Sequence, residues 1–288
     1  MTPRAPSTLR RRSGEPSLWT GYAEVIGDPI EQSRSPLIHG FWLEALGIDA
    51  EYRRRKVTRA ELAGYLAERR GDPAWRGSNV TMPLKLDAIA LADNASDRAV
   101  AAGAANLLTM REGKLVAANT DVGAIALLVD RLRQGGAAMG SVTLLGNGGA
   151  ARAALVALKL VGISAVRIQA RDMAEAVKLA VEFGTEVEPA PITEPIVSDG
   201  LINATPLGMT GRDCLNCDVS RLPHNGWVFD MVADPPETPL IAAARARGLA
   251  TVSGLEMLVE QAATSFKLLF DADPPRDRDA ILWQKLEP

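Results

Sequence analysis

Val142-Thr-Leu-Leu-Gly-Asn-Gly-Gly-Ala-Ala-Arg152 joins a short apolar run to a glycine-rich turn and the start of a helix. The apolar residues 142–145 predict a buried strand, and the helix formers of 150–161 predict a helix directly after it. The turn between them has the G-x-G-x-x-A form of a dinucleotide-binding loop. Glycines let the backbone approach a pyrophosphate, and the helix N-terminus presents free N–H groups to it. We therefore predict a nucleotide site at Gly146, Asn147, Gly148, Gly149 and Ala150.

Strands and helices alternate after this turn. Strands are predicted at 166–169, 200–203, 226–231 and 250–252, and helices at 173–183 and 239–247. This alternation favours an α/β domain built on a parallel sheet. A long helix is expected at 121–133, before the glycine-rich strand, and we place the junction with the preceding domain in this helix.

The N-terminal part predicts a second α/β unit. Strands are expected at 22–26, 51–57 and 77–83, the last followed by a turn, and helices at 36–46, 60–70 and 84–91. The segments 106–110 and 114–118 are expected to form a hairpin. Within this unit, the row Arg53-Arg54-Arg55-Lys56 is typical of a solvated edge strand. The last long helix, at 255–270, is long enough to return to this unit.

The composition is that of an ordinary globular protein, with 288 residues, 47% hydrophobic and 23% charged. A net charge of −3 gives no reason to expect nucleic acid or an anionic membrane as a partner. The apolar runs are broken well short of the roughly 18 residues that a membrane span needs. Two cysteines do not make a disulfide framework, so we expect a cytoplasmic protein.

The first 18 residues differ from the rest of the chain. They hold four arginines, three prolines and almost no apolar periodicity. A secretory signal needs an apolar stretch after the charges, and none follows here. We predict a disordered tail at 1–18.

Short motifs recur along the chain in a specific order and spacing. They are Gly27-Asp-Pro-Ile-Glu-Gln-Ser-Arg-Ser-Pro36 with His39, Asn79-Val-Thr-Met-Pro-Leu-Lys85, Gly103-Ala-Ala-Asn106, Asn119-Thr-Asp121, Gly146-Asn-Gly-Gly-Ala150, Asn203-Ala-Thr-Pro-Leu-Gly-Met209 and Gly254-Leu-Glu-Met-Leu-Val-Glu-Gln261. Together they resemble the shikimate dehydrogenase family over nearly the whole chain. The resemblance implies a substrate domain at 19–120 that includes the returning 255–288, and a Rossmann-like NADP-binding domain at 121–254, with a cleft between them. It also implies NADP-dependent interconversion of shikimate and 3-dehydroshikimate.

Two residues are the candidates for proton transfer in that reaction. A secondary alcohol must lose its hydroxyl proton as hydride leaves, and the resemblance assigns this step to Lys85 and Asp121. A lysine in a partly closed cleft is a suitable acid or base, and a neighbouring carboxylate orients it. The chain has only two histidines, so histidine-based dehydrogenase chemistry has few places to occur.

The substrate is expected to be a ring hydroxy acid. Ser33 and Ser35, two residues apart on a turn, supply hydroxyls for its carboxylate, although helix capping before Pro36 is the alternative. The ring hydroxyls are assigned to the polar side chains of Asn79, Thr81, Asn106 and Gln261.

The cofactor is predicted to be NADP, with NAD left open. The residues Ala170-Arg171-Asp172 stand where the family's NADP form has Asn-Arg-Thr, and Arg171 can pair with a 2′-phosphate. Asp172 departs from that pattern, since it stands in place of the threonine. Its charge would repel the 2′-phosphate of NADP or bind the free ribose of NAD. Arg152 either reaches a phosphate or lies on the surface. The resemblance adds Thr205, Met231 and Gly254 to the cofactor site.

Other departures surround the substrate. Ala233 stands where the family usually has a tyrosine that helps hold the substrate, and further departures occur at Gln32, Gly40, Leu107 and Val122. They indicate a divergent member. The alternatives are a quinate or dual quinate/shikimate dehydrogenase using NAD or NADP, and a protein that binds a dinucleotide or ring acid without turnover.

Cys214-Leu-Asn-Cys217 is the remaining motif. A zinc site needs about four ligands and no second C-x-x-C exists, so we expect a plain loop and no metal. The oligomeric state is left at monomer or homodimer.

Overall fold

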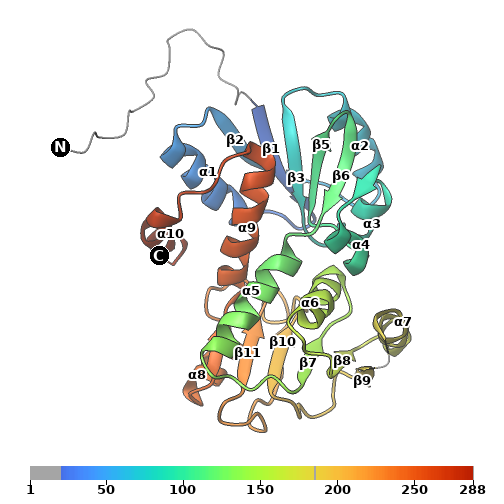
Figure 1. The fold of residues 1–288 in the computed structure, drawn as a ribbon, viewed down its shortest axis with the longest axis vertical. Helices are drawn as coiled ribbons and strands as arrows, with labels where there is room; N and C mark the ends of the chain where they lie inside the picture. The colour runs from blue at the N-terminus through green and yellow to red at the C-terminus, as the bar shows by residue number, and fades with distance from the viewer. Residues whose placement is uncertain (1–20, 185, 288) are drawn as a thin grey trace, which may run out of the picture.

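The chain forms two α/β units, one at each end of the molecule (Figure 1). The computed structural model describes residues 21–184 and 186–287, so the tail predicted at 1–18 lies outside the described residues. Within that part, each unit is built on a six-stranded sheet with helices packed against it. The α/β, two-domain fold is therefore confirmed.

The first sheet is mixed. Its strands are β1 (Gly21–Gly27), β2 (Ala50–Lys56), β3 (Trp75–Val80), β4 (Asn94–Ala95), β5 (Leu107–Arg111) and β6 (Lys114–Ala118), in the order β2-β1-β3-β5-β6-β4. β2 is at the edge, as the row of basic residues predicted. β5 and β6 form the expected antiparallel hairpin. Glu112 and Gly113 turn it with φ of 51° and 74°, the two positive values of a tight hairpin turn.

The second sheet is parallel throughout. Its strands are β7 (Val142–Leu145), β8 (Val166–Ala170), β9 (Val187–Pro191), β10 (Gly200–Asn203), β11 (Trp227–Asp230) and β12 (Ala250–Val252), in the order β12-β11-β10-β7-β8-β9. The strand order reverses between β7 and β10, which is where open α/β sheets bind ligands beyond the carboxyl ends of their strands. The glycine-rich turn follows β7 and therefore lies at this reversal.

Helices cover both sheets. They are α1 (Ser35–Leu46), α2 (Leu62–Arg70), α3 (Lys85–Ala90), α4 (Asp97–Ala102), α5 (Asp121–Gln134), α6 (Gly149–Leu160), α7 (Met173–Phe183), α8 (Pro239–Ala246), α9 (Gly254–Phe270) and α10 (Asp279–Leu286), with a 3₁₀ turn, η1 (Arg276–Arg278), before α10. On the first sheet, α1, α9 and α10 pack on one side, around Trp42 and Phe266. Helices α2 and α3 pack in a second core around Tyr65 and Leu84.

Two helices connect the units. Helix α5 buries Ile125, Leu128 and Val129 in the core of the second sheet. Helix α9 starts beside that sheet and then buries Val259 and Phe266 in the core of the first, and Figure 1 shows it running between the two units beside α5. We propose the domain boundaries at the starts of α5 and α9, as the sequence predicts.

The short elements β4, α4, β9 and α10 were not predicted. β4 has two residues and α4 six, too few to show a period. β9 contains two prolines, which an edge strand tolerates and a sequence pattern scores as a break. None of the helices in the described ranges is long and apolar enough to cross a membrane.

Candidate active site

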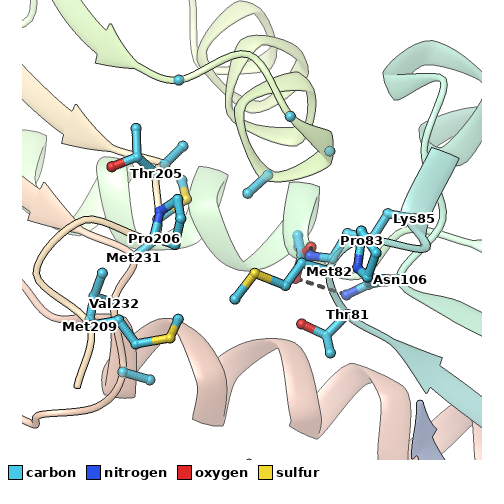
Figure 2. A pocket seen from close by; sticks show the side chains of 18 of the residues that line it. Thr81, Met82, Pro83, Lys85, Asn106, Thr205, Pro206, Met209, Met231 and Val232 are labelled. Carbon is cyan, nitrogen blue, oxygen red and sulfur yellow. Dashed lines mark hydrogen bonds and ion pairs between the residues drawn. The ribbon is translucent and has the colours of Figure 1, made fainter. Parts of the chain in front are cut away.

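A cavity of about 630 Å³ lies between the two units. Figure 2 shows its labelled side chains in two groups that face each other, one around Lys85 and Asn106 and the other around Thr205 and Met231. Every residue that the sequence assigns to catalysis, substrate or cofactor contributes to the lining: Ser33, Ser35, Asn79, Thr81, Lys85, Asn106, Asp121, Gly146, Asn147, Gly148, Gly149, Ala150, Ala170, Arg171, Thr205, Met231, Gly254 and Gln261. The structure thus brings them together, while their individual roles stay predictions.

Lys85 and Asp121, both part of this lining, form an ion pair. Lys85 Nζ lies 2.6 Å from Asp121 Oδ2, with the side chains 16% and 5% exposed. Each is the first residue of a helix, Lys85 of α3 and Asp121 of α5. A helix N-terminus favours negative charge, which suits the Asp121 carboxylate. Because an ammonium group carries three donors, Lys85 has others to offer a substrate hydroxyl.

Asn106 fixes the other oxygen of this carboxylate. Its Nδ2 donates to Asp121 Oδ1 at 2.8 Å, and its Oδ1 accepts from the backbone N–H of Thr120 at 2.7 Å. Asn106 Nδ2 also lies 3.4 Å from Gln261 Oε1, which brings α9 into the same network. Asp121 is therefore held on both oxygens and cannot rotate away from Lys85 without breaking a buried hydrogen bond.

A second polar network lies behind the substrate side chains. Tyr52 donates to Asn79 Oδ1 at 2.7 Å, and Asn79 Nδ2 donates to Ser265 Oγ at 2.8 Å. Ser265 Oγ in turn lies 3.1 Å from Thr120 Oγ1. Burial raises the pKa of Tyr52 well above its ordinary value, so its hydroxyl remains a donor. Tyr52 and Ser265 were not identified from the sequence.

The serines stand at the entrance to α1. Ser33 Oγ accepts from the backbone N–H of Ser35 at 3.4 Å, and Ser35 is buried. The N-cap residue of α1, Arg34, makes no side-chain cap among the described residues, but the Ser33 hydroxyl accepts from the first N–H of the helix, so capping stands beside substrate binding as a role for Ser33. Both line the cavity and stay assigned to the substrate carboxylate as a prediction.

The glycine-rich turn fits a dinucleotide. Gly146 has φ of 105°, and an added Cβ would lie 3.1 Å from the Ala204 carbonyl oxygen, so the turn requires glycine there. A Cβ at Gly148 would meet nothing within 4 Å, which leaves open space over the backbone. Gly148 caps α6 without a side-chain partner in the described part of the chain, so the helix N–H groups face the cavity free to bind a pyrophosphate.

The two residues that follow β8, Arg171 and Asp172, have different contacts. Arg171 is exposed, lines the cavity and has no ion pair with any residue that the structure describes. Asp172 caps α7, accepting from the Glu175 backbone N–H at 3.1 Å. The carboxylate that departs from the family pattern thus has a structural partner, although it also lines the cavity.

Arg152 does not line the cavity. It pairs with Glu182 of α7 at 2.6 Å and donates to the Ala102 carbonyl at 3.2 Å. Its charge is therefore engaged between α6, α7 and α4, which favours a structural role over one at a cofactor phosphate.

The opposite wall is made by loops of the second domain. Thr205 Oγ1 donates to Asn203 Oδ1 at 2.6 Å, which fixes the loop after β10. An added Cβ at Gly254 would lie 2.4 Å from the Val232 carbonyl, so α9 can start there only with glycine. Met82 and Met209 extend into the space between the two walls (Figure 2). Ala233, the departure from tyrosine, lines the cavity as well.

The remaining motifs lie outside this chemistry. His39 is fully buried, stacked 4.0 Å from the Tyr52 ring, and burial lowers its pKa to about 3. Cys214 and Cys217 are unpaired, and burial raises the pKa of the Cys217 thiol to about 11. Within the described ranges, no group of three or more histidine, cysteine or acidic residues is arranged to hold a metal ion.

Known proteins resemble this chain over most of its length. Residues 25–108 match the shikimate dehydrogenase substrate binding domain, and 254–279 match the shikimate 5′-dehydrogenase C-terminal domain. A shikimate dehydrogenase (NADP⁺) of Sphingopyxis alaskensis is 45% identical over 260 residues, which cover 90% of this chain and 94% of that protein.

Solved structures agree with this match. Shikimate 5-dehydrogenase of Thermus thermophilus, in complex with NADP(H) and shikimate, is 32% identical with a TM-score of 0.80, covering 92% of this chain and 99% of that one. Quinate dehydrogenase of Corynebacterium glutamicum, in complex with NAD, is 30% identical with a TM-score of 0.80 over the same shares of the two chains. With a 45% identical relative covering nine-tenths of its sequence, the chain belongs to the shikimate dehydrogenase family.

Proposed function

We propose that this protein is an NADP-dependent oxidoreductase that interconverts shikimate and 3-dehydroshikimate. The observation that carries the proposal is the Lys85–Asp121 pair, which lies on the cavity wall between the glycine-rich turn and the Asn79–Asn106 side of the first domain. The family membership and the name of the Sphingopyxis alaskensis relative support the same reaction.

The side chains act at the reacting hydroxyl. NADP, when bound, supplies the hydride acceptor in one direction and the hydride donor in the other. In the oxidation, hydrogen leaves the carbinol carbon with its electron pair, and the hydroxyl proton passes to Lys85 Nζ as Lys85 gives one of its own protons to Asp121 Oδ2, 2.6 Å away, so that a carbonyl remains. In the reduction, the pair returns that proton to the oxygen. Asn106 keeps Asp121 in position during both steps.

The rest of the lining orients the two reactants. Ser33 and Ser35 are assigned to the carboxylate, and Asn79, Thr81 and Gln261 to the ring hydroxyls. On the cofactor side, the backbone of the glycine-rich turn would hold the pyrophosphate and Arg171 the 2′-phosphate. Ala170, Thr205, Met231 and Gly254 would complete the wall along the cofactor. Binding both reactants in one cleft supplies the proximity that hydride transfer needs.

The quinate alternative is not favoured. The 45% identical relative carries the shikimate name, whereas the quinate dehydrogenase is 30% identical. Arg171 without an acidic partner in the described residues supports NADP over NAD. The cytoplasmic location, and a state of monomer or homodimer, remain part of the proposal.

Reduction of NADP⁺ and of NAD⁺ with shikimate and with quinate tests the proposal. We expect shikimate-dependent reduction of NADP⁺ to have the highest kcat/KM of the four combinations. Quinate-dependent turnover alone would replace the substrate assignment. Binding of both ligands, seen as thermal stabilisation, without any change in nicotinamide absorbance would favour a binding protein.

A further inference from the structure

We propose that Arg54, on edge strand β2, positions the Ser33–Ser35 turn and supplies positive charge for the carboxylate of the substrate. This inference rests on the proposed function, because it takes the substrate to be an anionic ring acid that binds at Ser33 and Ser35. Arg54 itself does not line the cavity, so it acts through Ser33.

The contact is a fork on one carbonyl oxygen. Arg54 Nε lies 2.8 Å from the Ser33 oxygen and Nη2 lies 2.6 Å from it. Ser33 is 21 residues away in sequence, so these bonds connect the turn before α1 to strand β2 of the sheet. Two hydrogen bonds from a rigid planar group fix both the distance and the direction of this carbonyl.

The turn depends on this bond because α1 does not use the Ser33 carbonyl. The backbone N–H groups of Leu37 and Ile38 both donate to the Arg34 oxygen, at 3.0 and 3.2 Å. The Ser33 oxygen therefore lies outside the hydrogen bonds of the helix, and Arg54 provides its donors. Without them, the peptide between Ser33 and Arg34 is free to reorient, and the Ser33 hydroxyl moves with it.

The charge of Arg54 is not neutralised by a neighbouring acid. Other cations near the turn have carboxylate partners: Arg34 lies 3.4 Å from Asp234, and Lys56 lies 3.2 Å from Asp28. Arg54 forms no ion pair with any residue in the described ranges, and its partner is a neutral carbonyl. A full positive charge thus stands behind the turn that is assigned to the carboxylate, where it attracts an anion.

Strand geometry explains why this arginine, of the three in a row, reaches the turn. Side chains alternate between the two faces of a strand, so Arg54 shares its face with Tyr52. Tyr52 stacks on His39 of α1, which places this face toward α1 and the turn that precedes it. Arg53 lies on the opposite face and pairs with Glu51 at the exposed edge. Arg55 shares that opposite face and provides a matched control.

The test compares Arg54→Ala, Arg54→Lys and Arg55→Ala in the full-length protein. We expect Arg54→Ala to raise the dissociation constant and the KM for shikimate roughly 10-fold, the scale of one charge-assisted hydrogen bond. The kcat and the KM for NADP⁺ should change by less than about twofold, because the reacting groups are untouched. Arg54→Lys keeps the charge and should recover part of the loss, and Arg55→Ala should resemble the wild type.

The methyl ester of shikimate separates charge from general damage. The ester has no carboxylate charge, so Arg54→Ala should lower kcat/KM for the ester less than for the acid. Equal losses on acid and ester, an unchanged KM for shikimate, or a parallel rise in the KM for NADP⁺ would each overturn the proposal.

Calorimetry of shikimate binding keeps this test independent of turnover. A wild type that binds shikimate but does not reduce NADP⁺ would overturn the proposed function alone. A wild type that binds shikimate no better than Arg54→Ala does would overturn the role of Arg54, even if NADP⁺ reduction is normal.

Discussion

No side chain separates Gly149 of the glycine-rich turn from Lys85 of the first domain. A Cβ added at Gly149 would lie 2.9 Å from Lys85 Cβ and 3.2 Å from Lys85 Cδ. The cofactor turn and the proton-transferring lysine are thus in direct contact across the cleft. The absence of a side chain at Gly149 is what permits that contact, because Lys85 Cβ is fixed to the backbone and cannot move out of the way alone.

We expect Gly149→Ala to lower kcat by about 10- to 100-fold, the scale on which small misplacements of a reacting group act. Gly149 is the first residue of α6, where alanine is no worse than glycine for the helix, so the melting temperature should not fall for reasons of propensity. Steady-state kinetics and thermal melting measure both effects. Gly148→Ala is the comparison. A Cβ there meets no protein atom within 4 Å, but it would enter the space left for the pyrophosphate, so this variant should raise the KM for NADP⁺ instead of lowering kcat. A normal kcat in Gly149→Ala would show that the contact is dispensable.

Replacing Lys85 by alanine should reduce turnover at least about 100-fold, the usual contribution of a general acid–base group. The change removes the ammonium group that lies 2.6 Å from Asp121. Stopped-assay kinetics at saturating substrate measure it, with the exposed Lys159→Ala of α6 as the control. Turnover near that of the wild type would remove Lys85 from the mechanism.

Arg171→Ala should weaken the binding of NADP far more than the binding of NAD, because only NADP carries the 2′-phosphate assigned to this side chain. Dissociation constants for both cofactors, measured by fluorescence titration, give the ratio. Arg152→Ala is the matched control: its guanidinium is bound to Glu182 and the Ala102 carbonyl, so it should lower stability and leave the NADP/NAD preference unchanged. Equal weakening of the two cofactors by Arg171→Ala would contradict the phosphate assignment.

Asp172→Thr should strengthen NADP relative to NAD. Threonine keeps an N-cap oxygen for α7 and removes a negative charge from the cavity wall. Asp172→Ala removes the charge and the cap together, so it should also cost about 1 kcal/mol of stability. Cofactor titration combined with urea denaturation distinguishes the two variants. An unchanged cofactor preference in both would mean that this carboxylate acts only as a cap.

His39 should make stability fall as the solution becomes acidic. Burial lowers its pKa to about 3, below its ordinary value of 6.5. Between these values the unfolded chain takes up a proton that the folded chain does not, so the free energy of unfolding decreases as pH falls from 6.5 toward 3. The slope is about 1.4 kcal/mol per pH unit. Above pH 6.5 this contribution is constant.

Urea denaturation of the wild type and of His39→Phe at pH 7.5, 6.5 and 5.5 measures this slope. Phenylalanine preserves a ring in contact with Tyr52 and does not titrate. The free energy of unfolding of the wild type should therefore fall, relative to that of His39→Phe, as the pH falls. His224→Gln, at an exposed position, should follow the wild type. Parallel profiles for wild type and His39→Phe would contradict the prediction.

The sequence predicts best what short segments determine. The strand, glycines and helix at 142–160 form a continuous local pattern, and the hairpin at 107–118 is set by its own turn. The convergence of Lys85 and Asp121 was inferred from the family motifs, and no local pattern would have placed them 2.6 Å apart.

Contacts between distant segments were harder to predict. Arg152 lies early in α6 near the glycines, and only the packing of α7 shows that Glu182 binds it. Arg54 is one of four adjacent cations, and its partner depends on the position of a turn 21 residues earlier. Ser265 gave a usable signal: it is polar, and it lies one helical turn after Gln261 on the same face of α9.

Helix α9 limits how this architecture can be exchanged between relatives. Its first residue, Gly254, lines the cofactor wall, and Gln261 lies among the substrate side chains two turns later, roughly 10 Å along the axis. Its remaining turns are embedded in the core of the first domain through Phe266 and Phe270. A cofactor domain transplanted from a relative must therefore be joined inside a continuous helix, where one inserted residue would rotate Gln261 by about 100° away from the cleft. The two domains have separate hydrophobic cores, yet recombination between relatives would have to exchange them together.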